Sequence, residues 1–140
     1  MKIAFLPVSC LPFHAYSLDE RPLGGTETSV ILLAEALQKL NHDIYVLSRF
    51  DNPPLSEPLY IPLNAINDLG ELDVLIVVRE WMPQLGGIKA KQYCLWTGDA
   101  YDQPQTLGIG DKRITEKLDA LLLVSDWHAD TLCQESGFPR

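Results

Sequence analysis

Two adjacent glycines, Gly24 and Gly25, stand directly before a segment in which apolar residues recur at helical spacing. Because glycine has no Cβ, the main chain at such a pair can approach a ligand closely. The first N–H groups of a helix lack partners within the helix, and together with the helix dipole they favour a bound anion. We therefore predict that Gly24, Gly25 and Thr26 bind a phosphate group. The alternative interpretation is a tight turn with positive φ that binds nothing.

The same segment lacks the two best-known phosphate-binding motifs. It contains neither the G-x-G-x-x-G spacing of dinucleotide-binding proteins nor a full P-loop, which argues against NAD or FAD binding and against simple NTP hydrolysis. Glu27 falls in the first turn of the expected helix, where a carboxylate complements the helix dipole. The three histidines and three cysteines are scattered, so the cysteines are expected as buried free thiols and no metal site is predicted.

Polar residues in loops, or directly after apolar runs, form a second group of candidates for contacts to a substrate. For His14 the alternative is a solvated loop residue, and for Arg79 and Glu80 it is an ion pair within the protein. Asp99 has turn capping as its alternative, while His128 is expected on the surface of the last helix. The candidate substrate contacts are His14, Arg79, Glu80, Asp99 and Ser125.

Alternating strands and helices would bring these residues together. The run Val-Leu-Ile-Val-Val at 74–78 is continuously apolar, as expected of a parallel strand covered on both faces. The apolar runs predict an α/β fold, a doubly wound and mainly parallel sheet of about six strands, with ligands bound outside the carboxyl ends of the strands. The expected strands are 1–9, 43–48, 59–63 (an edge strand, because of Pro62), 74–78, 92–97 and 120–124. The expected helical segments are 25–40, 65–69, 82–88, 112–118 and 126–135, and 10–23 is expected as a loop.

Length and composition limit the class of protein. The 140 residues suit a single domain spanning 1–140, and 46% apolar with 21% charged residues is typical of a soluble globular chain. A formal net charge of −8 disfavours nucleic acid as a partner. No apolar stretch is long enough to cross a membrane and no signal peptide is recognised, so a cytoplasmic location is expected. Peripheral membrane association stays open.

Three segments occur in an order that resembles a known family. They are Pro22-x-Gly24-Gly25-x-Glu27, then Leu95-Trp96-Thr97-Gly98-Asp99, then 122–127 followed by Gly137-Phe138-Pro139. Together they resemble the N-terminal domain of GT-B retaining glycosyltransferases, the large family that includes sucrose-phosphate synthase and bacterial mannosyltransferases. The likeness extends over essentially the whole chain.

The resemblance implies that this chain is the Rossmann-like, acceptor-side domain of a transferase whose C-terminal, donor-binding domain is absent from the chain. The implied reaction moves a sugar from a nucleotide diphosphate to a hydroxyl of a sugar, lipid or small molecule, with retention, without a metal and without a tightly bound cofactor. The expected partners are the nucleotide sugar, the acceptor and the chain's own C-terminal domain. The fragment alone is expected to be inactive.

The resemblance also distributes roles among the candidate residues. Gly24 and Gly25, with Thr26, would contact the donor diphosphate, and the second group of candidates would contact the acceptor. Many family members have a histidine after the fifth strand, where this chain has Thr97-Gly98-Asp99. The catalytic residue is therefore unknown, with Asp99 as the candidate. Trp96 is interpreted either as a core residue or as an aromatic surface on which a sugar ring stacks. The alternative function is a stand-alone flavodoxin-like or Rossmann-like binding module without catalysis.

Overall fold

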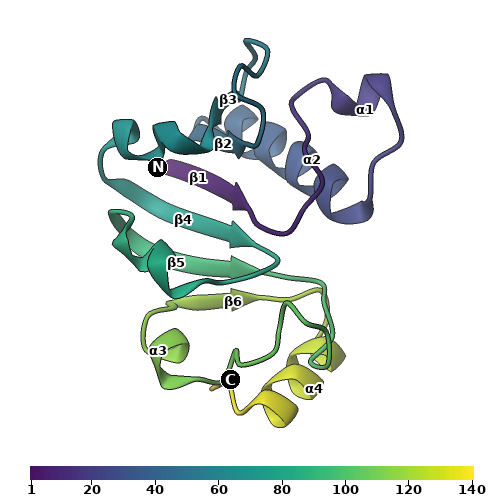
Figure 1. The fold of residues 1–140 in the computed structure, drawn as a ribbon, viewed down its shortest axis with the longest axis vertical. Helices are drawn as coiled ribbons and strands as arrows, with labels where there is room; N and C mark the ends of the chain where they lie inside the picture. The colour runs from purple at the N-terminus through teal and green to yellow at the C-terminus, as the bar shows by residue number, and fades with distance from the viewer.

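The structure, a computed structural model, describes residues 1–140 and contains one sheet of six strands in the order β3-β2-β1-β4-β5-β6 (Figure 1). All neighbouring strands pair in parallel, which confirms the predicted doubly wound α/β fold. The strands are β1 (Lys2–Pro7), β2 (Asp43–Ser48), β3 (Leu59–Pro62), β4 (Leu72–Val78), β5 (Ala90–Trp96) and β6 (Ala120–Leu122). The helices are α1 (Ser17–Glu20), α2 (Gly25–Lys39), α3 (Lys112–Thr115) and α4 (Asp126–Ser136), with 3₁₀ helices η1 (Leu63–Leu69) and η2 (Pro83–Gly87).

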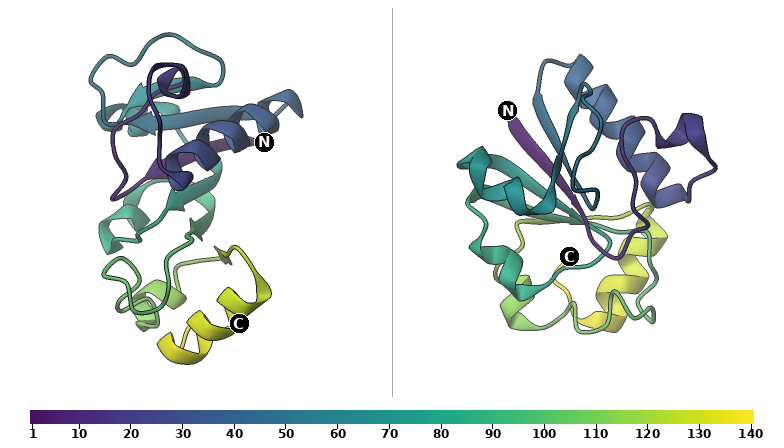
Figure 2. Two further views of the ribbon diagram at one scale, coloured as in Figure 1. Left: turned by 90° about the vertical axis from the view of Figure 1, so that its right-hand side faces the viewer. Right: turned by 45° about the horizontal axis from the view of Figure 1, so that its top comes forward.

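The sheet buries apolar side chains on both of its faces, because successive residues of a strand point to opposite sides. Phe5 of β1 belongs to the cluster that α2 covers with Val30. The next residue, Leu6, belongs to the cluster on the other face, where Leu132 of α4 packs. The turned views in Figure 2 show α2 and α4 well separated, with the strands between them. Both faces of the sheet are therefore covered by helices, as in other all-parallel sheets.

The ends of the two long helices follow ordinary capping rules. α2 ends before Asn41, whose φ of 69° lies in the left-handed region that asparagine tolerates at the end of a helix. α4 begins at a Ser125 cap, whose side chain accepts a hydrogen bond from the His128 N–H, and it ends at Gly137 with a φ of 77°. These caps fix where α4 starts relative to the end of β6.

The structure differs from the expected elements mainly at short segments. The loop predicted over 10–23 contains one helical turn, α1, and the segments at 65–69 and 82–88 form the 3₁₀ helices η1 and η2. The helix predicted over 112–118 ends at Thr115, because the chain must turn back toward β6, where the Asp119 carboxylate accepts a hydrogen bond from the Tyr93 N–H at 2.8 Å. β3 lies at the edge of the sheet and ends at Pro62, as predicted.

The strand order places a topological switch point between β1 and β4. From β1 the chain builds the sheet in one direction through β2 and β3, and it then returns to the other side of β1 to add β4, β5 and β6. Connections that diverge in this way leave a crevice at the carboxyl ends of the strands, which is where ligands bind in such folds. None of the helices has the length and apolar character needed to cross a membrane.

Candidate functional site

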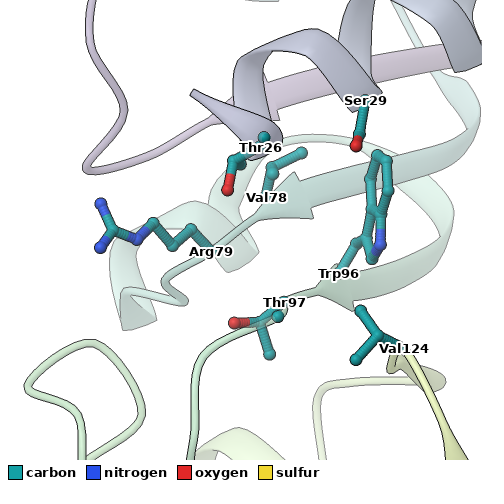
Figure 3. A pocket seen from close by; sticks show the side chains of 9 residues that line it. Thr26, Ser29, Val78, Arg79, Trp96, Thr97 and Val124 are labelled. Carbon is teal, nitrogen blue, oxygen red and sulfur yellow. The ribbon is translucent and has the colours of Figure 1, made fainter. Parts of the chain in front are cut away.

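A cavity of about 280 Å³ lies at the carboxyl edge of the sheet, beside the switch point. Its wall is formed by the beginning of α2 and by residues at or just beyond the ends of β4, β5 and β6 (Figure 3). The nine lining residues are Gly25, Thr26, Ser29, Val78, Arg79, Trp96, Thr97, Gly98 and Val124. The cavity therefore brings together Gly25, Thr26 and Arg79, which the sequence singled out.

The glycine pair begins α2 in an ordinary backbone conformation. Gly24 is the N-cap residue with φ −65° and ψ 166°, so the interpretation of a turn with positive φ is wrong. A Cβ at Gly24 would lie 2.6 Å from the Oε2 atom of Glu27, whereas a Cβ at Gly25 would meet nothing within 4 Å. A side chain at position 24 would therefore make the Glu27 carboxylate shift. Gly25 instead leaves open space at the wall of the cavity.

The first turn of α2 contains main-chain donors without partners. The N–H groups of Gly25, Thr26 and Glu27 donate to no acceptor within the chain, and the first bond of this turn is that from the Thr28 N–H to the Gly24 carbonyl. Unpaired N–H groups at this end of a helix, combined with the helix dipole, attract an anion. Two of these residues, Gly25 and Thr26, line the cavity.

Glu27 lies in the first turn of α2, where it complements the helix dipole as predicted. It is buried, and its Oε1 atom accepts a hydrogen bond from the Leu11 N–H at 3.1 Å. Glu27 does not line the cavity. Its role in the structure is to attach the segment after β1 to the beginning of α2.

Arg79 lies directly after β4 in a left-handed conformation, with a φ of 82°. Such a φ is uncommon for a residue with a side chain and persists where surrounding contacts hold it. The Arg79 Nε atom lies 3.0 Å from Oδ2 of Asp99, and its Nη1 donates to the Ser9 carbonyl. The expected Arg79–Glu80 ion pair is wrong, because Glu80 instead accepts a hydrogen bond from the Ser9 hydroxyl. The pairing register of β1 with β4, and of β4 with β5, brings these partners next to the end of β4.

Asp99 is the centre of a polar network beside the cavity. Besides its bond to Arg79, its N–H donates to the Thr97 hydroxyl at 3.0 Å, and its carbonyl lies 2.7 Å from Nε2 of His128. His128 is buried rather than exposed, so its expected surface position is wrong. Its Nδ1 faces the Val124 N–H at 3.4 Å, which leaves Nε2 as the donor to Asp99. α4 thus holds the loop after β5 in place.

His14 lies outside the cavity, in the segment between β1 and α1. It is buried against the rings of Tyr16 and Phe50, so the interpretation as a solvated loop residue is wrong. Its Nε2 atom lies 3.4 Å from Oε2 of Glu20, and its Nδ1 accepts a hydrogen bond from the Tyr16 N–H at 3.2 Å. The structure thus gives His14 an internal set of partners, and its contact with an acceptor stays a prediction.

Ser125 also lies outside the lining of the cavity, and its hydroxyl accepts from the His128 N–H at 3.0 Å. We expect Ser125→Ala to lower the free energy of unfolding by about 0.5–2 kcal/mol, because an N–H at the start of α4 loses its acceptor. Ser125→Asn should retain most of the stability, since asparagine caps helices equally well. Urea denaturation followed by circular dichroism measures both. An alanine variant as stable as the wild type would contradict the capping role.

Some lining residues were not predicted from the sequence. Ser29 follows Thr26 at the i, i+3 spacing that places two residues on one helix face, and this signal could have identified it. Val124 gives no such signal, because only the pairing of β6 with β5 brings it to the cavity. Trp81 is buried in the core, whereas Trp96 is partly exposed and lines the cavity.

The thiols near the site are held in the neutral form. Burial, and secondarily the Glu27 carboxylate, raise the pKa of Cys10 to about 11. Burial, with a smaller contribution from Asp119, likewise raises the pKa of Cys94. A thiol that stays protonated near neutral pH is a poor nucleophile and a poor metal ligand. No three His, Cys, Asp or Glu side chains are grouped so that they could hold a metal ion.

The site therefore combines unpaired amides at the start of α2, Arg79 and an aromatic wall around one cavity. Asp99, the partner of Arg79, follows the lining residue Gly98 and does not itself line the cavity. Its chemistry suits binding of an anionic group beside a partly apolar ring. Comparison of the chain with protein-family models, curated proteins and solved structures gave no match.

Proposed function

We propose that the chain is the N-terminal, acceptor-side domain of a nucleotide-sugar-dependent glycosyltransferase that transfers a sugar to a hydroxyl group. The observation that carries the proposal is the row of unpaired N–H groups at Gly25 and Thr26, which lie at a cavity on the carboxyl edge of the sheet. Such donors bind phosphate groups, and a diphosphate is one of the anions that suit them. The open space above Gly25 allows that group to reach the main chain.

In this proposal a second α/β domain supplies most of the donor site and closes over the carboxyl edge. Closure would exclude water, which otherwise competes with the acceptor hydroxyl for the sugar. The 140-residue chain by itself would bind a diphosphate weakly and transfer no sugar. This division between two domains is supported by the resemblance of the three sequence segments to a GT-B N-terminal domain, and the proposal expects the full protein to contain such a second domain.

Titration of the ¹⁵N-labelled chain with UDP and GDP, followed by NMR, tests the proposal. We expect the amide signals of Gly25 and Thr26 to shift, and uridine, which lacks the diphosphate, to leave them unchanged. Gly25→Val should weaken binding at least about tenfold, since its side chain would occupy the space open to the diphosphate.

Gly87→Val is the matched control, because a Cβ at Gly87 also meets nothing within 4 Å but lies away from this cavity. If neither nucleotide shifts the α2 amides, or if Gly25→Val binds them as tightly as the wild type, the proposal fails. Binding of uridine as tightly as UDP would instead support the alternative of a stand-alone binding module for a planar ring.

A further inference from the structure

The charge of Arg79 is already balanced. Arg79 is the one charged residue among the nine that line the cavity, and its guanidinium pairs with the Asp99 carboxylate at 3.0 Å. The other charged residues described near it, Glu80 and Glu27, are carboxylates and add no positive charge. Outside the first turn of α2, the cavity therefore presents no unpaired cation to an anionic substrate.

The same pair retains a free acceptor and a free donor. Oδ1 of Asp99 accepts no hydrogen bond from the chain, and Nη2 of Arg79 donates none. The Arg79 side chain is held by its bond to the Ser9 carbonyl, and the Asp99 side chain by the bond from Arg79 Nε to its Oδ2 atom. The main-chain carbonyl of Asp99 contacts His128. A carboxylate acceptor next to a guanidinium donor matches a pair of neighbouring hydroxyls, each of which both donates and accepts.

An aromatic wall lies on the other side of the cavity. Trp96 packs edge-on against Phe5, with ring centroids 6.5 Å apart, and it is partly exposed where it lines the cavity. Figure 3 shows the Trp96 ring between the Ser29 hydroxyl and Val124, while the Arg79 guanidinium and the Thr26 and Thr97 hydroxyls extend to the opposite side. The cavity thus presents an aromatic ring together with several hydrogen-bonding groups. A pyranose ring has matching features, with apolar C–H faces and hydroxyls at its edge.

Resting on the proposed function, we infer that the acceptor is an uncharged sugar, which places one face on Trp96 and two neighbouring hydroxyls on Asp99 and Arg79. Discrimination against a phosphorylated or carboxylated acceptor follows from Asp99, which cancels the charge of Arg79 and would repel a second anion. Asp99 then acts as a specificity-determining contact for the acceptor.

The test compares neutral and phosphorylated sugars as ligands of the wild-type chain by NMR titration. Methyl α-glucoside and methyl α-mannoside are expected to shift the indole signal of Trp96 and the amide signal of Asp99. Glucose 6-phosphate and mannose 6-phosphate are expected to shift these two signals with no higher affinity than the neutral glycosides, whereas a phosphate bound at the α2 amides shifts Gly25 and Thr26. Tenfold tighter binding of the phosphates at Trp96 and Asp99, or no shift of these signals with any of these sugars, would overturn the inference.

The variant Asp99→Asn makes the test sharper. Removing the carboxylate charge should weaken glycoside binding at least about tenfold and should tighten binding of the sugar phosphates, because Arg79 loses its counter-charge. Asp111→Asn is the matched control, since Asp111 pairs with Arg113 at 3.1 Å away from the cavity, and it should change neither affinity. Unchanged glycoside binding by a folded Asp99→Asn variant would also overturn the inference.

This experiment separates the inference from the function on which it rests. If UDP or GDP shifts the α2 amides while sugar phosphates outcompete glycosides, the transferase proposal stands and the neutral acceptor is wrong. If glycosides bind at Trp96 and Asp99 while no nucleotide reaches Gly25, the sugar site stands and the transferase proposal falls.

Discussion

Replacing Phe5 by alanine is expected to lower the free energy of unfolding by about 3–5 kcal/mol, a large part of the stability of an ordinary domain. Phe5 has no exposed surface, and it lies in the middle of β1, the strand on which both halves of the sheet are built. Removing its ring leaves a cavity between α2 and the sheet that rigid neighbours cannot fill. It also removes the edge-on contact of Phe5 with Trp96, so the Trp96 ring at the candidate site should become more mobile.

Phe50→Ala is the matched control for this prediction. Phe50 is 38% exposed and belongs to neither of the two buried clusters, so its loss should cost about 1 kcal/mol or less. Urea denaturation monitored by circular dichroism gives both values on one scale. A Phe5 variant that loses less than about 1 kcal/mol would show that β1 does not pack as described.

Gly110→Ala is expected to destabilise the chain by about 3 kcal/mol or more, at the upper end of what overpacking causes. A Cβ at Gly110 would overlap the main-chain carbonyl of Ser136, which is the last residue of α4. Because that atom belongs to the main chain, no side-chain rotation relieves the overlap. The loop that ends at Gly110 carries Asp99, so the variant should also disturb the contact between Asp99 and His128.

Gly87→Ala provides the contrast, because a Cβ there meets nothing within 4 Å and its φ is not positive. Its stability should stay within about 0.5 kcal/mol of the wild type or rise slightly, since alanine reduces the entropy of the unfolded chain. Thermal denaturation of the two variants measures the difference between their melting temperatures. Equal melting temperatures would mean that the end of α4 is not packed against Gly110.

The fold could be predicted where the sequence has strong periodic signals. The continuous apolar run at 74–78 correctly indicated a strand buried on both faces. The helical spacing of apolar residues after Gly25 correctly indicated α2, which buries Val30, Ile31 and Ala34. The short segments were less certain, because one turn of helix depends on neighbours distant in sequence rather than on its own residues. The turn at Asp119 illustrates this, since its partner is the N–H of Tyr93.

The candidate site could be predicted only in part. Gly25 and Thr26 follow from a local motif, and the structure places them at the cavity. The partners of Arg79 do not follow, because Asp99 and Ser9 reach it only through the register of three strands. The burial of His128 was missed for a similar reason, as a histidine in a helix gives no sign of which face meets a loop. Sequence patterns thus located the amide donors but not the polar network.

The two outer strands of the sheet are both short. β3 has four residues and ends with a proline that cannot donate a hydrogen bond, and β6 has three residues. A foreign strand that approached either border would find too few free main-chain groups to form a ladder, which is how many native sheets avoid growing sideways into aggregates. The short edge strands therefore disfavour the addition of further strands to this sheet. Ligand binding is expected at the carboxyl ends of the strands instead.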